Sequence, residues 1–231
     1  MTLSLSRRLP LYCLAVSLIL GAILIPWPAT ARIWLSGETG LIELLTVVFA
    51  LWGVWTAARI AIDHRKLPYP ALGLWFGLFA VGLFVLAGEE ASWGQSWFHW
   101  QTPESYAAIN RQGETNLHNL SSVTEELPKA ALIVAALLGG VIWPIRAWAK
   151  KTGPYVGSGW FSWVWPSALI WPAGALTIVF RVLERVLVAT DVEDMIRAQY
   201  IGVRESIELY AVLFVLAYLW DVRRRQLSQS A

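Results

Sequence analysis

Acidic and histidine side chains gather in one segment of the chain, residues 88–119, directly after a strongly apolar run. Two adjacent glutamates, Glu89 and Glu90, come first, and Glu114 and His118 follow with a spacing of four residues. Ionisable groups at a membrane boundary are costly to desolvate, so they are candidates for function. We therefore expect Glu89, Glu90 and His118 to be the catalytic residues.

The same segment has the residue types of a metal site. A carboxylate and an imidazole four residues apart lie on one face of a helix, and Glu114 and His118 have that spacing. With His99 as a third ligand, the predicted metal ligands are His99, Glu114 and His118, and the ion is Zn, Mn or Fe. Such a metal would lower the pKa of a bound water and supply a nucleophile for hydrolysis. The alternative is a hydrogen-bonded cluster without metal, formed by Glu114, Asn116 and Asn119.

Further charged residues lie near the ends of other apolar runs. Guanidinium groups match the oxygens of an anionic headgroup such as phosphate. The predicted substrate-binding residues are accordingly Trp93, Arg181, Arg185, Arg204 and Glu208. The alternative is ion pairing along the helices, between Arg181 and Glu184 and between Arg204 and Glu208.

The elements that must position these residues are membrane helices. Hydrophobic residues make up 57% of the chain and charged residues only 15%, against about 25% in a soluble domain. A bilayer span needs roughly 20 residues, and tilt and interfacial residues accommodate shorter runs. We predict an all-α polytopic integral membrane protein, a single domain over residues 1–231, with an outward-facing re-entrant or interfacial helical loop over residues 89–129. About six transmembrane helices are expected, over residues 11–26, 41–58, 71–87, 130–145, 160–180 and 207–220.

Cationic residues orient these spans. Eleven of the 18 Lys and Arg lie in segments on one side of the membrane, namely Arg7, Arg8, Arg59, Arg65, Lys66, Arg146, Lys150, Lys151, Arg223, Arg224 and Arg225. The positive-inside rule places that side and both termini in the cytoplasm, which predicts a multi-pass protein of the cell inner (plasma) membrane. These basic segments need no partner beyond anionic lipid headgroups. The opposite ends of the spans share one depth, so Glu43, Glu90 and Glu208 are expected to line one outward-facing pocket.

Residues 1–31 have two interpretations. Arg7 and Arg8, the apolar run and the sequence Ala-Thr-Ala at 29–31 are typical of a cleaved signal peptide and also of a first transmembrane helix. We favour the uncleaved helix because Pro26 and Pro28 also suit a helix end. Both interpretations leave the orientation of the other spans unchanged.

Local signals predict structure inside the external loop. Residues 102–104, Thr-Pro-Glu, combine a hydroxyl N-cap, a proline and an acid in the first turn, which predicts a helix start. Gly113 is placed to end that helix. Ser122 and Glu125 have the spacing of a capping box for the following span.

The first part of the loop, residues 88–100, has the pattern of an interfacial helix. Glu89 and His99 fall on one side of such a helix at about 100° per residue. Trp93, Trp97 and Trp100 form the adjoining stripe, which suits the headgroup region of a bilayer. We therefore expect a helix that lies along the outer leaflet.

Two resemblances follow from these motifs. The sequences GEEASWGQ at 88–95 and ETNLHN at 114–119 resemble a block shared by uncharacterised bacterial polytopic membrane proteins, which implies a membrane setting and no particular activity. The block also resembles the CAAX-protease and bacteriocin-processing family of intramembrane proteases, whose first motif is a Glu-Glu pair followed by an aromatic residue and arginine. That resemblance implies that Glu90 activates water and that His118 holds it or the oxyanion. Gly94 stands in place of the arginine, and no later His-x-x-x-Asn motif follows.

Together these observations predict a membrane-embedded enzyme, metal- or glutamate-dependent, that hydrolyses a lipid-linked or membrane-embedded substrate at the outer leaflet. The alternative is a non-enzymatic membrane protein, an assembly partner or small transporter, whose Trp-rich loop docks a membrane-protein partner or a second copy in a homo-oligomer. Ionisable residues are absent from the midplane of the runs, which counts against ion-coupled transport. No nucleotide-binding glycine motif is present, and the thin cationic collars do not support nucleic-acid binding.

Overall fold

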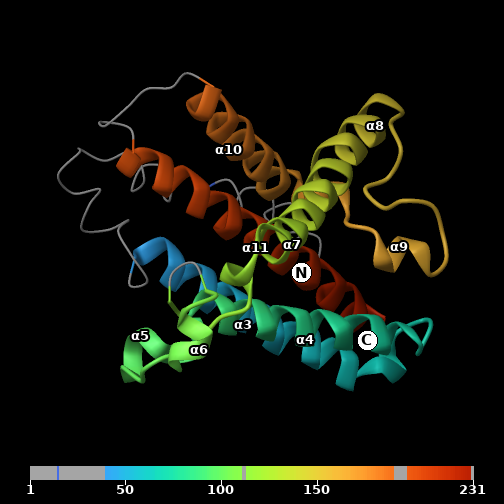
Figure 1. Cartoon of the computed structure of the whole chain (residues 1–231). Coiled ribbons are helices and arrows are strands. Elements are labelled where there is room, and N and C mark those ends of the chain that lie inside the picture. The colour runs from blue at the N-terminus through green and yellow to red at the C-terminus, as the bar shows by residue number, and fades with distance from the viewer. Residues whose placement is uncertain (1–14, 16–39, 111–112, 190–196, 230–231) are drawn as a thin grey trace.

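The computed structural model describes residue 15 and the ranges 40–110, 113–189 and 197–229. Within these ranges every regular element is a helix, which confirms the predicted all-α class (Figure 1). The predicted first span, residues 11–26, lies outside the described residues except for residue 15, and so does the Ala-Thr-Ala sequence at 29–31.

Four helical segments of the described chain are long and apolar enough to cross a membrane. The first, α3, has 22 residues, and at 1.5 Å per residue it matches the thickness of a hydrocarbon core, about 30 Å. These segments contain the second to fifth predicted runs, which supports the assignment as a membrane protein. They are α3 (Leu41–Ile62), α4 (Leu72–Glu90), Glu126–Ala149 and Phe161–Ala189.

The helices α3 and α4 form an antiparallel hairpin. They are joined by a tight connection that contains the single turn η1 (His64–Lys66). Gly53 of α3 lets the pair approach closely, because a Cβ atom there would lie 2.7 Å from the Leu83 side chain of α4. The hairpin thus places the end of α4, with its two glutamates, beside the start of α3.

The third apolar segment is a continuous helix that changes from α-helical to π-helical hydrogen bonding in its middle. Its centre is a π-helical turn that contains Gly139 and Gly140. Gly140 packs directly on Gly174 of the following segment, since a Cβ at either position would lie 2.6 Å from the other residue's Cα. In Figure 1 this helix crosses α10. The two segments comprise α7 (Ser122–Ala135), η4 (Ala136–Ile142), α8 (Trp143–Ala149), α9 (Phe161–Val164), η5 (Ala168–Ile170) and α10 (Trp171–Ala189).

The last helix, α11 (Arg197–Ser228), is the core of the molecule. It packs against both α3 and α10, and its residues Leu209, Tyr210 and Leu219 are fully buried. Its uncharged stretch lies between Glu208 and Asp221, which is shorter than the roughly 20 residues of a full span. The sixth predicted span therefore falls on a helix that is buried mainly by protein, and α11 is not among the four apolar segments.

The arginines near the end of α11 bind inside the protein. Arg223 forms an ion pair with Asp63 at 2.7 Å, and the hydrogen bond from Arg223 holds the pKa of the Asp63 carboxyl below its ordinary value. The Arg225 guanidinium lies 4.2 Å from the centre of the Tyr155 ring and 4.0 Å from that of Trp163. Cation–π contacts of this kind stabilise the fold. This cluster fastens α11 to the hairpin turn and to the segment before α10, a role that sequence analysis did not foresee.

Candidate functional site

The chain turns sharply after α4. Ser92, Trp93 and Gly94 have φ values of 42°, 55° and 91°, in the left-handed region that non-glycine residues rarely adopt. The turn lays the Trp93 ring against Gly88, where a Cβ atom would lie 2.7 Å from it. The predicted continuous helix over residues 88–100 is therefore wrong. The chain instead forms two short elements, η2 (Ser92–Gly94) and α5 (Gln95–Phe98).

The second predicted loop helix starts where the sequence indicates but is short. It is α6 (Glu104–Ala107), and it ends well before Gly113, so Gly113 is not its C-terminal cap. Thr102, the predicted N-cap, makes other contacts. Its hydroxyl accepts a hydrogen bond from Gln95 at 2.9 Å and lies 2.9 Å from the hydroxyl of Thr115. These bonds join the two arms of the loop.

The helix α7 has the predicted kind of cap, one residue earlier in the chain. Ser121 and Thr124 form the capping box, in which each hydroxyl accepts a bond from the other residue's backbone N–H at 3.1 Å. The predicted pair was Ser122 and Glu125. The helix continues through Pro128, so the start of α7 is set before the proline and not after it.

Glu89 is a structural carboxylate. Its side chain is buried, and one oxygen accepts a hydrogen bond from the Trp93 indole at 2.8 Å. The other oxygen accepts one from the backbone N–H of Leu117 at 2.6 Å. Glu89 therefore ties the end of α4 to the returning arm of the loop, and it also lines the cavity described below. Its predicted catalytic role stays a prediction.

Glu114 is held in a second group of hydrogen bonds. Its Oε2 accepts bonds from the Ser92 hydroxyl at 2.8 Å, from the Asn116 amide at 2.6 Å and from the Asn119 amide at 3.4 Å. Asn116 is almost fully buried, and its own backbone carbonyl accepts a bond from Asn110. This is the hydrogen-bonded cluster that the sequence offered as the alternative to a metal site.

The predicted metal ligands are arranged differently from the expected geometry. Residues 113–117 are not helical, so Glu114 and His118 do not share a helical face. His99 is exposed on left-handed backbone with a φ of 57°. His118 begins the turn η3 (His118–Leu120), and its side chain lies outside the described part of the structure. Among the described residues, no three His, Cys, Asp or Glu side chains are grouped to hold a metal ion. A metal site stays a prediction.

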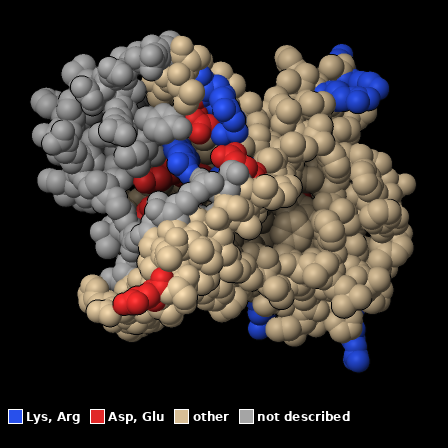
Figure 2. Space-filling view, viewed as in Figure 1, with Lys and Arg blue, Asp and Glu red and all other residues tan. Residues whose placement is uncertain are grey.

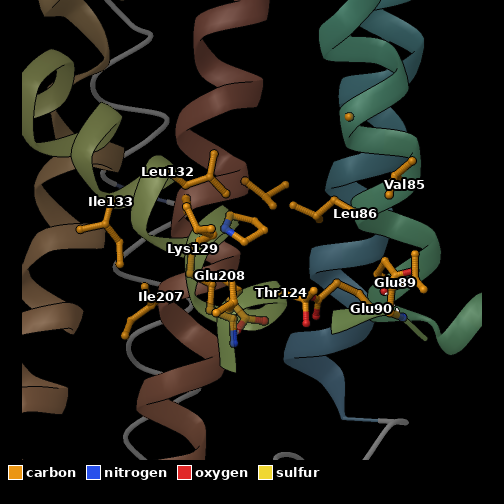
Figure 3. A pocket seen from close by; sticks show the side chains of 17 residues that line it. Val85, Leu86, Glu89, Glu90, Thr124, Lys129, Leu132, Ile133, Ile207 and Glu208 are labelled. Atoms are coloured by element: carbon orange, nitrogen blue, oxygen red, sulfur yellow. Dashed lines mark hydrogen bonds and ion pairs between the residues drawn. The ribbon is translucent and has the colours of Figure 1, made fainter. Parts of the chain in front are cut away.

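A cavity of about 450 Å³ lies between α4, α7 and α11. Its polar side chains, which include Glu90, Lys129 and Glu208, lie together, with hydrocarbon side chains on one side of them (Figure 3). The volume is within the usual range for small-molecule sites, about 300–1,000 Å³. The apolar lining consists of Gly82, Val85, Leu86, Leu117, Val123, Leu127, Pro128, Leu132, Ile133, Ile207, Ala211 and Val212.

Three charged side chains from three helices meet in this cavity. The Lys129 ammonium lies 2.6 Å from the Glu208 carboxylate. Figure 3 shows Glu90 and Glu208 extending toward one another from α4 and α11. Glu43 and Glu205 interact electrostatically with this pair, so the structure brings together the glutamates of three predicted span ends.

Lys129 was not among the predicted site residues. It closes the predicted loop and starts the apolar part of the third segment, a position typical of a residue that reaches the headgroups. The sequence contains one feature that could have identified this residue: Lys129 is the only lysine between Lys66 and Lys150. The capped start of α7 and its packing near α11 turn this side chain toward Glu208 instead.

The other predicted substrate contacts lie away from the cavity. Glu208 lines it, whereas Trp93, Arg181, Arg185 and Arg204 do not. Arg181 is paired with Glu184, as the alternative interpretation expected, and lies 3.9 Å from Glu126 of α7. The side chains of Arg185 and Arg204 are exposed.

The charges on the visible face are unevenly distributed. Figure 2 shows atoms of Lys, Arg, Asp and Glu together in and beside one hollow, while most of the rest of that face is uncharged. Opposite charges in surroundings of low polarity interact strongly, because the local dielectric constant is low. Many of the charged side chains visible on this face are thus concentrated at one place.

Comparison with known proteins does not add to this picture: no family model, curated protein or solved structure matches the chain. The functional argument therefore starts from the cavity and its polar groups.

Proposed function

We propose that the protein is a membrane-embedded hydrolase that acts on a lipid-linked substrate, with Glu90, Glu208 and Lys129 as its acid–base centre. One observation carries the proposal: the carboxyl groups of Glu90 and Glu208 and the Lys129 ammonium lie together in the wall of a mainly apolar cavity. Charged groups in such surroundings are expensive, and they mark functional sites in membrane proteins. A carboxyl pair that shares one proton supplies an acid and a base side by side.

The chemistry follows from the contacts. In the proposed reaction Glu208, which is paired with Lys129, is the ionised base, and Glu90 is the protonated acid. Glu208 accepts a proton from a water molecule while the water oxygen bonds to a carbonyl carbon of the substrate, and Glu90 donates its proton to the carbonyl oxygen. The carbonyl then re-forms, and the bond from carbon to the leaving oxygen or nitrogen breaks. The proton taken from water passes to the leaving group, and Glu90 recovers its own.

The proposal includes the topology expected from the sequence. Six spans with both termini in the cytoplasm of the inner membrane place the cavity and the loop of residues 88–120 at the outer leaflet. The basic residues near Arg59 and Arg146 then lie at the cytoplasmic headgroups, where they contact anionic lipid. A cavity near the outer ends of α4 and α11 is within reach of the headgroup region.

The test is hydrolysis in proteoliposomes made from a total lipid extract in oxygen-18 water. Wild type is expected to release an acyl product that carries one labelled oxygen, detected by mass spectrometry of the lipids. Glu90→Gln and Glu208→Gln should each lower the rate by about 10²- to 10⁴-fold, the usual contribution of general acid–base catalysis. Glu104→Gln, an exposed acid of the loop, is the matched control and should keep the wild-type rate. Equal rates in wild type and Glu90→Gln, or no labelled product from wild type, would contradict the proposal.

The metal-dependent form of the hypothesis needs its own measurement. Zn, Mn or Fe bound by His99, Glu114 and His118 would appear in the metal content of the purified protein. His118→Ala should then remove it. A protein with no metal in either form leaves the carboxyl pair as the centre of the reaction.

A second candidate function is docking through the loop. Trp97, Phe98 and Trp100 are 50%, 74% and 41% exposed, and the rings of Phe98 and Trp100 are stacked with centroids 6.0 Å apart. Exposed aromatic clusters of this kind bind partner proteins or lie in the headgroup region. If docking is the function, Trp97→Ala should abolish co-purification of a partner or of a second copy, and Glu90→Gln should leave it unchanged.

A further inference from the structure

The exposed part of the cavity lining is mainly apolar. Val85, Leu117, Val123 and Leu127 are 41%, 56%, 61% and 63% exposed, and Thr124 is the one polar side chain among the exposed lining residues. A mouth for a water-soluble substrate would be rimmed by polar groups that keep their hydration. An exposed apolar rim instead favours contact with hydrocarbon, and a ligand that crosses it loses no polar hydration.

The interior matches a hydrocarbon chain with one polar group. Leu132 of α7 faces Leu86 of α4 across the cavity, Ile133 also lines it, and Val212 of α11 lines it and is almost fully buried. Such a lining can receive a hydrocarbon chain from the bilayer without exposing the chain to polar groups. The charged groups are confined to one part of the lining, so a polar linkage can contact them while the chain lies in the apolar part.

Gly82 keeps that space open. It lies in the interior of α4, where glycine destabilises a helix by about 1 kcal/mol relative to alanine. A Cβ atom at Gly82 would meet no atom within 4 Å, so close packing does not require a glycine at this position. Because Gly82 lines the cavity, a side chain there would project toward the space that a ligand needs.

We infer that the substrate is an acyl lipid of the surrounding bilayer, which enters the cavity sideways past Val85 and Leu127 and places its carbonyl linkage beside Glu90, Glu208 and Lys129. This names the substrate class of the proposed hydrolase and rests on that function. Lys129 and Glu208 compensate each other's charge, and Glu90 is the protonated acid of the proposed function. A neutral ester or amide linkage therefore fits beside these three side chains of the cavity better than a bare anion does.

The probe is a lysophosphatidylcholine with a diazirine in its acyl chain, mixed at low ratio into phosphatidylcholine nanodiscs that hold the protein. After illumination, mass spectrometry locates the labelled residues. Wild type should be labelled at Leu132 and Val212 inside the cavity as well as at Leu74, which is 79% exposed on α4. Gly82→Phe should lose the cavity labels and keep the label at Leu74.

Gly77→Phe is the matched control. Gly77 is on the same helix and does not line the cavity, and a Cβ atom there would also meet no atom within 4 Å. Its variant should keep the cavity labels, and thermal unfolding should be alike for the two variants. Labels that are confined to Leu74 in wild type, or cavity labels that persist in Gly82→Phe, would overturn the inference.

Glu90→Gln separates this inference from the proposed function. It should keep the cavity labels and lose hydrolysis. Cavity labelling without hydrolysis by wild type would contradict the hydrolase alone and leave a lipid-binding site. Hydrolysis without cavity labelling would contradict the lateral lipid site alone.

Discussion

The loop of residues 88–120 and the cavity next to it both contain carboxyl groups, but the neighbours of these groups differ. In the loop, the carboxylates of Glu89 and Glu114 accept hydrogen bonds from indole, amide, hydroxyl and backbone donors. In the cavity, the carboxyl group of Glu90 faces that of Glu208. A carboxylate surrounded by donors has its charge compensated and holds structure in place. Two adjacent carboxyl groups are unfavourable when both are ionised, and that property underlies the acid–base role proposed for Glu90 and Glu208.

Helix geometry separates the two adjacent glutamates. Successive residues of an α-helix point about 100° apart, so Glu89 and Glu90 at the end of α4 face different neighbours. Glu89 faces the turn that contains Trp93, and Glu90 faces α11. Both glutamates line the cavity, so the difference between them is a difference of partners: donors of the loop for Glu89 and the carboxyl group of Glu208 for Glu90.

The largest effect on stability is expected from removal of the loop carboxylate. Glu89→Ala leaves the Trp93 indole N–H and the Leu117 backbone N–H without their acceptor, and should lower the free energy of unfolding by about 3 kcal/mol. Glu90→Ala removes one member of a carboxyl pair and should change the free energy of unfolding by less than about 1 kcal/mol. Chemical unfolding in detergent measures both variants. If Glu90→Ala destabilises as much as Glu89→Ala does, the contrast between the two regions is wrong.

The next effect concerns the ammonium group of the cavity. Lys129→Met removes the partner of the partly buried Glu208 and should destabilise the protein by about 2 kcal/mol, because an uncompensated charge remains. The double variant Lys129→Met with Glu208→Gln removes both charges and should recover most of that loss. Unfolding measurements on the four forms of this cycle give the coupling energy. A coupling energy near zero would show that the pair contributes nothing to the fold.

The smallest effect is expected from the cap that orients Lys129. Ser121→Ala removes the hydroxyl that accepts the Thr124 backbone N–H, and loss of such a cap lowers stability by about 1 kcal/mol. Ser158→Ala, in the segment before α9, is a control that changes the same residue type away from the cavity. Hydrogen exchange of the first turn of α7 should increase only in Ser121→Ala. Unchanged exchange there would mean that the cap does not define the start of this helix.

The apolar runs and their boundaries were predictable because burial in a bilayer depends on length and composition. The runs at 41–58 and 71–87 became α3 and α4, and the glutamates at the outer ends were recognised as functional candidates. The path of the loop was not predictable. The sequence pattern at 88–100 favours a helix, but the chain forms a left-handed turn at residues 92–94. Packing of the Trp93 ring on Gly88 stabilises that turn. The apparent ligand spacing of Glu114 and His118 failed for the same reason, since residues 113–117 are not helical.

The sequence by itself determined that the protein is helical, that several of its segments suit a membrane, and that its acids cluster near one set of helix ends. Those properties follow from composition and from the spacing of apolar residues along the chain. Only the tertiary structure decided which acids accept hydrogen bonds from the loop and which meet each other in the cavity. The partner of Glu89 lies 28 residues away at Leu117, and Glu90 meets Glu208 and Lys129 from two other helices. No local pattern specifies such partners, because they are set by how the helices pack.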